Sequence, residues 1–137
     1  MNATPTATLG YVILYVEDVG ASLAFYERAF GLSRRFFHDE DGKAYGELET
    51  GAARLAFASL GLVGEHLRQD VTVSAAGKPP LGFETALVTN DVQSLYDRAV
   101  AAGASPESPP ETKPWGQVVA YVRDVNGFLV ELCTAMP

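Results

Sequence analysis

Few side chains of this 137-residue chain have the chemistry of a metal ligand or a nucleophile. There is one cysteine, Cys133, and there are two histidines, His38 and His66. A single cysteine excludes an intramolecular disulfide and a multi-cysteine metal cage, and it is typical of a reducing compartment. We interpret Cys133 as a small core side chain rather than a nucleophile. We expect both histidines on the surface and predict a cytoplasmic location.

The elements that position the remaining candidates follow from an internal repeat. Residues 10–32 and 82–104 each contain a glycine-led apolar strand, an aspartate, an amphipathic helix and a closing glycine. Asp18 and Asp91 precede their helices as N-caps. A repeat of this length indicates two copies of one supersecondary unit, and such copies often enclose a shared cleft.

Each copy continues into further strands. Residues 33–38, 44–49 and 54–59 predict a three-stranded meander, and residues 117–123 and 128–134 predict a hairpin. Residues 105–114 contain four prolines, which predicts an edge strand or an extended loop. We therefore predict an α+β fold with a flexible tail at 1–8, a βαβββ module at 9–59, a linker at 60–80 and a second βαβββ module at 81–134.

Composition excludes several classes of partner. The formal net charge is −7, from 17 acidic and 10 basic residues, and this balance disfavours binding to a phosphate backbone. No apolar run approaches the ~20 residues of a membrane-spanning helix. The first residues have neither basic side chains nor a long apolar stretch, so we expect no secretion signal. We expect no nucleic-acid partner and no membrane partner.

Three segments carry a resemblance to a known family: VEDVGASLAFYERAFGL, YGELETGAARLAFAS and KPWGQVVAYVRDVNGFLVELCT. In this order and spacing, over residues 10–134, the chain resembles the vicinal oxygen chelate superfamily. Its members include glyoxalase I, extradiol dioxygenases, methylmalonyl-CoA epimerase, fosfomycin resistance enzymes and bleomycin resistance proteins. The resemblance implies two βαβββ modules curled around a central cleft, often completed in a head-to-head dimer. It does not imply one activity.

The resemblance also implies where a metal would bind, on the first and fourth strands of each module. Carried over one by one, these positions hold Tyr11 and Ala56 in the first module and Glu84 and Glu131 in the second. Two carboxylates and a phenol make a poor site for Zn, Ni or Fe. We expect no cofactor and no tightly bound transition metal; if a divalent metal binds, Glu84 and Glu131 are its ligands.

Strand alternation then predicts the lining of the cleft, because side chains two residues apart share one face. The predicted lining is aromatic and apolar, with two acids and one guanidinium: Tyr11, Ile13, Tyr15, Arg54, Ala56, Glu84, Trp115, Tyr121 and Glu131. Such a lining suits a flat organic molecule. Two structural alternatives stay open: Glu84 and Glu131 paired with Arg54, and Trp115 fixing a turn.

Three functions are consistent with these residues. The first is a metal-free small-molecule-binding protein of the drug-sequestering or antibiotic-resistance type, whose acidic balance suits a cationic aromatic ligand. The second is a lyase, isomerase or dioxygenase that uses a metal in an altered ligand set, or proton transfer by Glu84 or Glu131. The third is a module that assists a neighbouring enzyme. We expect a homodimer in each case, and the sequence does not decide whether the protein is an enzyme or name a catalytic residue.

Overall fold

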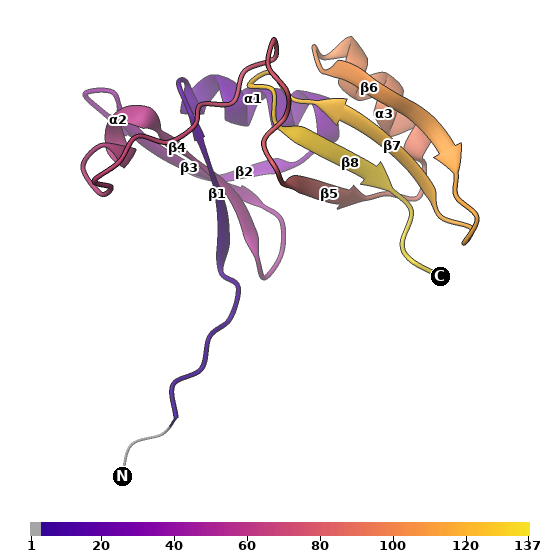
Figure 1. The fold of residues 1–137 in the computed structure, drawn as a ribbon, viewed down its shortest axis with the longest axis horizontal. Helices are drawn as coiled ribbons and strands as arrows, with labels where there is room; N and C mark the ends of the chain where they lie inside the picture. The colour runs from indigo at the N-terminus through magenta and orange to yellow at the C-terminus, as the bar shows by residue number, and fades with distance from the viewer. Residues whose placement is uncertain (1–3) are drawn as a thin grey trace.

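Each half of the chain forms a four-stranded mixed sheet with one helix against it (Figure 1). The computed structural model describes residues 4–137. The first half contains β1 (Tyr11–Val16), α1 (Val19–Phe30), β2 (Ser33–Glu40), β3 (Lys43–Glu49) and β4 (Arg54–Ser59). The second contains β5 (Glu84–Val88), α3 (Val92–Ala101), β6 (Ser105–Thr112), β7 (Val118–Arg123) and β8 (Leu129–Cys133). The predicted fold of two βαβββ modules is confirmed.

Strand order places the first and fourth strands of each module side by side. The orders are β1-β4-β3-β2 and β5-β8-β7-β6, so β1 and β5 are edge strands. In both sheets the first strand runs parallel to the fourth, with Tyr11 opposite Arg54 and Glu84 opposite Leu129. The helix between the first two strands allows this parallel pairing, which a tight turn cannot make.

Local sequence signals set the ends of the helices. The side chain of Asp18 accepts a hydrogen bond from the backbone N–H of Ala21 at 2.9 Å, and Asp91 accepts one from Ser94 at 3.0 Å. These bonds satisfy backbone donors that have no partner inside the helix. Gly31 ends α1 with φ at 70°, in the left-handed region that glycine adopts without steric cost.

One hydrophobic core extends across both modules, on the helix side of the sheets. Leu14 and Phe57 bury their side chains against α1, and Val130 and Leu132 continue the same core in the second module. The two helices also contact each other. Across the junction, Tyr26 donates its hydroxyl hydrogen bond to the buried Asp124 at 2.6 Å.

The segment between the modules contains the short helix α2 (Leu60–Val63) and then irregular chain. Arg123 attaches part of this segment to the second module. Its guanidinium donates to the carbonyls of Ala75 and Ala76 at 3.0 and 3.3 Å, and to Gly127 at 2.9 Å. A buried, fully charged donor group is thereby paired with three backbone acceptors.

On the face of each sheet away from its helix, which we call the open face, the edge strand is exposed while central positions such as Ala56 are buried. Tyr11, Ile13 and Val88 are 51%, 41% and 66% exposed on the two edge strands. Residues 4–10 add to the exposed surface, since they extend away from both sheets (Figure 1). The accessible surface is 8301 Å², whereas a compact 14.6 kDa monomer exposes about 6,900 Å².

Two sequence expectations concern the ends and surfaces of the chain. Residues 1–3 of the predicted tail lie outside the described residues, and residues 4–8 are extended and exposed. Within residues 4–137, no helix has both the length and the apolar character needed to cross a bilayer.

Candidate functional site

Two of the four predicted metal positions come together on the second sheet. Glu84 on β5 and Glu131 on β8 lie on adjacent strands, with Ala86 opposite Glu131. Burial, the charge of Glu131 and a hydrogen bond with it raise the pKa of Glu84. Two neighbouring carboxyl groups disfavour each other's ionisation, because both carry the same charge when ionised. The two residues therefore form a carboxyl pair able to hold a proton.

Two further groups surround the carboxyl pair. Tyr121 on β7 donates its hydroxyl hydrogen bond to Glu131 Oε1 at 2.9 Å, and burial together with this bond raises its pKa to about 12. Burial and Glu131 also raise the pKa of the Cys133 thiol to about 11. At neutral pH the thiol is protonated, which makes Cys133 a poor nucleophile.

The other two metal positions lie on the first sheet and offer little to a metal. Tyr11 on β1 is half exposed, and Ala56 on β4 is completely buried and has no donor atom in its side chain. The acid opposite Ala56 is Glu47 on β3. Glu47 accepts hydrogen bonds from the Tyr45 hydroxyl at 2.8 Å and from Arg35 Nη1 at 3.2 Å. Its charge is therefore already partnered.

The donor set does not fit the transition metal that the fold family suggests. A zinc or iron site needs three or more nitrogen, sulfur or carboxylate ligands directed at one point. In the part of the chain that the structure describes, no three His, Cys, Asp or Glu side chains are grouped in that way. Glu84 and Glu131 supply only two, and neither Tyr11 nor Ala56 completes the set.

The open face of the first module instead carries an aromatic cavity of about 230 Å³. It is lined by Ile13, Tyr15, Tyr45, Ala58, Leu62, Val63 and His66. These residues come from β1, β3, β4, α2 and the segment just after α2. Burial, and then the hydrogen bond to Glu47, raises the pKa of Tyr45, which keeps the phenol neutral. The cavity is thus apolar and aromatic, with one imidazole.

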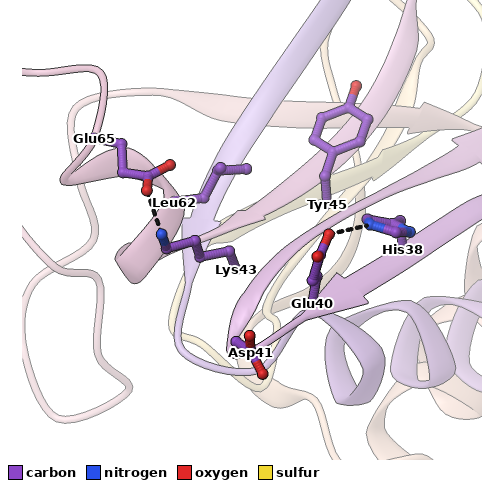
Figure 2. Close-up of a pocket in the computed structure, with 7 residues that line it drawn as sticks. All are labelled: His38, Glu40, Asp41, Lys43, Tyr45, Leu62 and Glu65. Carbon is purple, nitrogen blue, oxygen red and sulfur yellow. Dashed lines mark hydrogen bonds and ion pairs between the residues drawn. The ribbon is translucent and has the colours of Figure 1, made fainter.

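A second hollow of about 420 Å³ adjoins the aromatic cavity, since Tyr45 and Leu62 line both. Figure 2 shows its lining: His38, Glu40, Asp41, Lys43, Tyr45, Leu62 and Glu65. Lys43 pairs with Glu65, and His38 Nε2 lies 3.4 Å from Glu40 Oε2. The β2–β3 turn holds Asp41 and Gly42 at φ values of 53° and 78°, as a two-residue hairpin requires. We call the carboxylates of Glu40, Asp41 and Glu65 the acidic rim.

The remaining predicted residues have separate positions. Trp115 is 53% exposed, and its Nε1 donates to Gln117 Oε1 at 2.9 Å, which favours the turn-fixing alternative. Arg54 does not pair with Glu84 or Glu131, because the one carboxylate within 4.0 Å of it among residues 4–137 is that of Glu49. The alternative of a structural network around Arg54 therefore does not hold for the two glutamates.

Sequence reasoning missed several residues of these hollows. Both histidines are exposed, as expected, yet His66 lines the aromatic cavity and His38 lies beside the acidic rim. Tyr45 shares a strand face with Glu47, so the alternation in residues 45–49 carried a usable signal. Leu62 and His66 lie in a segment of weak hydrophobic periodicity, and the sequence there carried no comparable signal.

Comparison with known proteins agrees with this architecture. The sequence profile of the Glyoxalase/Bleomycin resistance protein/Dioxygenase superfamily matches residues 8–132. The chain belongs to this superfamily. No curated protein sequence matches the chain, so the superfamily assignment rests on the profile and the fold.

Solved structures of the superfamily share the fold at low sequence identity. A glyoxalase-related enzyme from Fulvimarina pelagi is 23% identical, with a TM-score of 0.79 over 95% of this chain and 89% of its own. TioX from Micromonospora sp. ML1 is 22% identical, with a TM-score of 0.68 over 93% and 98%. A superfamily enzyme from Burkholderia phytofirmans PsJN is also 22% identical, with a TM-score of 0.67 over the same shares. Such likenesses support the fold and leave the activity open.

Proposed function

We propose that this member of the superfamily is a small-molecule-binding protein whose cleft takes a flat aromatic cation without a metal. The observation that carries the proposal is the aromatic cavity on the first module, open to the acidic rim. Tyrosine faces attract cations through the ring quadrupole, and the carboxylates of Glu40 and Asp41 add Coulomb attraction, whereas Glu65 is already paired with Lys43. A sequestering or resistance role follows from binding alone and needs no chemistry.

We further propose that a second copy of the chain completes the cleft. The open face of the first module and the carboxyl pair of the second lie on different sheets of one chain. In a homodimer with twofold symmetry, each first module faces the partner's second module, and two equal clefts form. The exposed apolar side chains on β1 and β5 and the large accessible surface support this arrangement. Light scattering should then give twice the mass of the chain at micromolar concentration, and a 14.6 kDa particle would contradict it.

Calorimetric titration with 9-aminoacridine, a flat cation, tests the binding site, with neutral acridone for comparison. Tyr15→Leu removes one ring of the aromatic cavity and should weaken 9-aminoacridine binding by roughly twofold to thirtyfold, because such a contact stabilises by about 0.5 to 2 kcal/mol. Phe37→Leu is the matched control, since Phe37 is also partly exposed and lies outside the aromatic cavity. Equal binding by the two variants, or tighter binding of acridone, would contradict the proposal.

One observation favours a second candidate, metal-independent proton transfer. The raised pKa of Glu84 and its direct interaction with Glu131 are typical of a carboxyl group that works as a general acid or base. In this candidate Glu84 moves the proton, and Tyr121 orients Glu131. Glu84→Gln would abolish turnover of an isomerase or lyase substrate while preserving its binding. A purely binding protein would show no turnover to lose.

A further inference from the structure

The Tyr45 ring, which forms one wall of the aromatic cavity, is hydrogen-bonded to a buried carboxylate. Its hydroxyl donates to Glu47 Oε2 at 2.8 Å, and Glu47 is 7% exposed. The two residues lie two positions apart on β3, so both side chains are on the open face. Glu47 lines neither the aromatic cavity nor the hollow beside it. A ligand in the aromatic cavity would therefore touch the Tyr45 ring and not Glu47.

A β-bulge brings the countercharge of this carboxylate to the same face. The register of β2 against β3 shifts between Arg34 and Phe36, so Arg35 is the extra residue. Regular alternation would put Arg35 and Phe36 on opposite faces, whereas a bulge can direct both to one face. Arg35 Nη1 lies 3.2 Å from Glu47 Oε1. The Phe36 ring centroid lies 6.4 Å from that of Tyr45, so both side chains reach the open face.

The hydrogen bond to a carboxylate changes the electron density of the Tyr45 ring. A phenol that donates to an ionised acceptor forms a charge-assisted bond, and groups bonded in a chain polarise one another. The phenol oxygen then releases more electron density into the ring, which strengthens the negative face that attracts a cation. Burial and the bond to Glu47 raise the pKa of Tyr45, so the phenol keeps its proton and the bond persists at neutral pH.

The acidic rim acts on a cation in a different way. Its three carboxylates are exposed, and salt screens the attraction of exposed charges over about 10 Å at 0.1 M ionic strength. One of them, Glu65, is also paired with Lys43. The bond between Tyr45 and Glu47 is short and largely buried, so salt weakens its effect little. The two contributions can therefore be separated by ionic strength.

We propose that Glu47 is a positioning residue that sets the charge preference of the aromatic cavity, acting through the Tyr45 ring. It fixes the ring and makes the ring face more attractive to a cation. Cation–π attraction needs the charge within about 6 Å of the ring centroid. The ligand class is therefore a cation whose charge is delocalised over its own rings, rather than an aromatic body with a distant ammonium group. The inference rests on the proposed binding function, because it concerns the same cavity.

Calorimetric titration tests this with 10-methylacridinium, a permanent cation without an N–H donor, and with neutral 10-methylacridone. Glu47→Gln should weaken 10-methylacridinium binding by about threefold to tenfold, because the phenol loses its ionised acceptor. The loss should be equal in dilute buffer and in about 0.5 M NaCl. Binding of 10-methylacridone should stay like that of the parent, which also shows that the cavity is folded.

Glu49→Gln is the matched control. Glu49 lies on the same strand and face and pairs with the same Arg35, at 3.4 Å, whereas the Tyr45 hydroxyl donates to Glu47. At the higher salt concentration Glu49→Gln should bind both probes as the parent does. Loss of 10-methylacridinium binding equal to that of Glu47→Gln would overturn the proposal.

Tyr45→Phe separates action through the ring from direct Coulomb attraction, and it keeps the test valid if Glu47→Gln does not fold. It removes the hydroxyl and keeps the ring, so it should weaken 10-methylacridinium binding by a similar factor. Adding Glu47→Gln to Tyr45→Phe should then cause little further loss. In the absence of ligand, the carbon-13 signal of Tyr45 Cζ should move upfield in Glu47→Gln, because the phenol no longer donates to a charged acceptor.

Three results would overturn this inference alone. They are parent-like binding of 10-methylacridinium by Glu47→Gln, equal weakening of the two probes, and an undiminished effect of Glu47→Gln in the Tyr45→Phe background. Failure of the parent to bind 10-methylacridinium would overturn the proposed function, and this inference with it.

Discussion

The open faces of the two sheets have the same backbone plan and different chemistry. At the equivalent position of the central strand, the first module has Ala56 and the second has Glu131. On the strand next to it, opposite these residues, the first module has Glu47 and the second has Tyr121. The glutamate of this pair of positions thus lies on the third strand of the first module and on the fourth strand of the second.

Each face retains a tyrosine that donates its hydroxyl hydrogen bond to a glutamate, but the charge around that glutamate differs. In the first module Arg35 neutralises Glu47, whereas in the second Glu84 lies beside Glu131. The first face is therefore free to form an aromatic cavity, and the second retains a titratable pair. A duplicated fold thus determines where side chains point, while the residues of each copy set its own electrostatics.

The sharpest difference in packing between the modules lies at two equivalent turns. Gly127 in the β7–β8 turn and Gly51 in the β3–β4 turn both have positive φ, at 88° and 100°. A Cβ at Gly127 would lie 2.4 Å from the backbone carbon of Ala75, whereas a Cβ at Gly51 would meet nothing within 4 Å. The second turn is thus packed against the segment between the modules, and the first is free.

We expect Gly127→Ala to lower the free energy of unfolding by about 2 to 5 kcal/mol, from left-handed strain plus the clash with backbone. Gly51→Ala carries only the strain and should lower it by about 1 to 2 kcal/mol. Urea titrations of the two variants measure the difference. Equal losses would mean that the segment around Ala75 does not hold this position in solution.

The next prediction exchanges a residue between the modules at the helix–sheet contact. Gly46 on β3 corresponds to Ala120 on β7, and a Cβ at Gly46 would lie 2.5 Å from Leu23 Cδ1. Leu23 is completely buried, so Gly46→Ala should lower the free energy of unfolding by about 1 to 3 kcal/mol. In a double-mutant cycle, Leu23→Val should relieve part of this loss. Additive losses would show that the two residues do not make the close contact seen here.

The smallest expected effect distinguishes the electrostatics of the two faces. Glu131→Gln removes the neighbouring charge and should move the pKa of Glu84 down toward its ordinary value, leaving burial as the remaining cause of the shift. Carbon-13 NMR of the Glu84 carboxyl group measures this change. Glu107→Gln on β6 is the control and should leave the Glu84 pKa unchanged.

The same variant has a consequence for stability. A carboxyl group whose pKa is raised by folding favours the folded state at low pH, and this contribution is lost as the pH rises through the folded-state pKa. The parent should therefore lose stability as the pH rises from the ordinary glutamate pKa through the raised pKa of Glu84. Glu131→Gln should narrow the pH range over which this stability is lost. An unchanged dependence of the unfolding free energy on pH would contradict the interaction between Glu84 and Glu131.

Much of the architecture was predictable from short-range patterns, because capping, turn and alternation signals act between residues close in sequence. Asp18 and Asp91 begin the two helices and Gly31 ends the first helix. Residues 105–112 form an edge strand, which is one of the two alternatives predicted for this proline-rich segment. The family positions of Glu84 and Glu131 likewise come together on adjacent strands.

The charge partners and the cavities depended on the tertiary structure, because their members are far apart in sequence. The pairing of Glu47 with Arg35 depends on how two strands align, and the aromatic cavity depends on where the segment after α2 places His66. The placement of Arg54 beside Glu49, and not in an ion pair with Glu84 or Glu131, depends on how β3 aligns with β4. The repeated fold and the residue types on each open face therefore follow from the sequence alone. Which side chains neutralise one another, and which are left to bind a ligand, follows from the tertiary structure, since charge pairing and cavity shape depend on distances that no local pattern encodes.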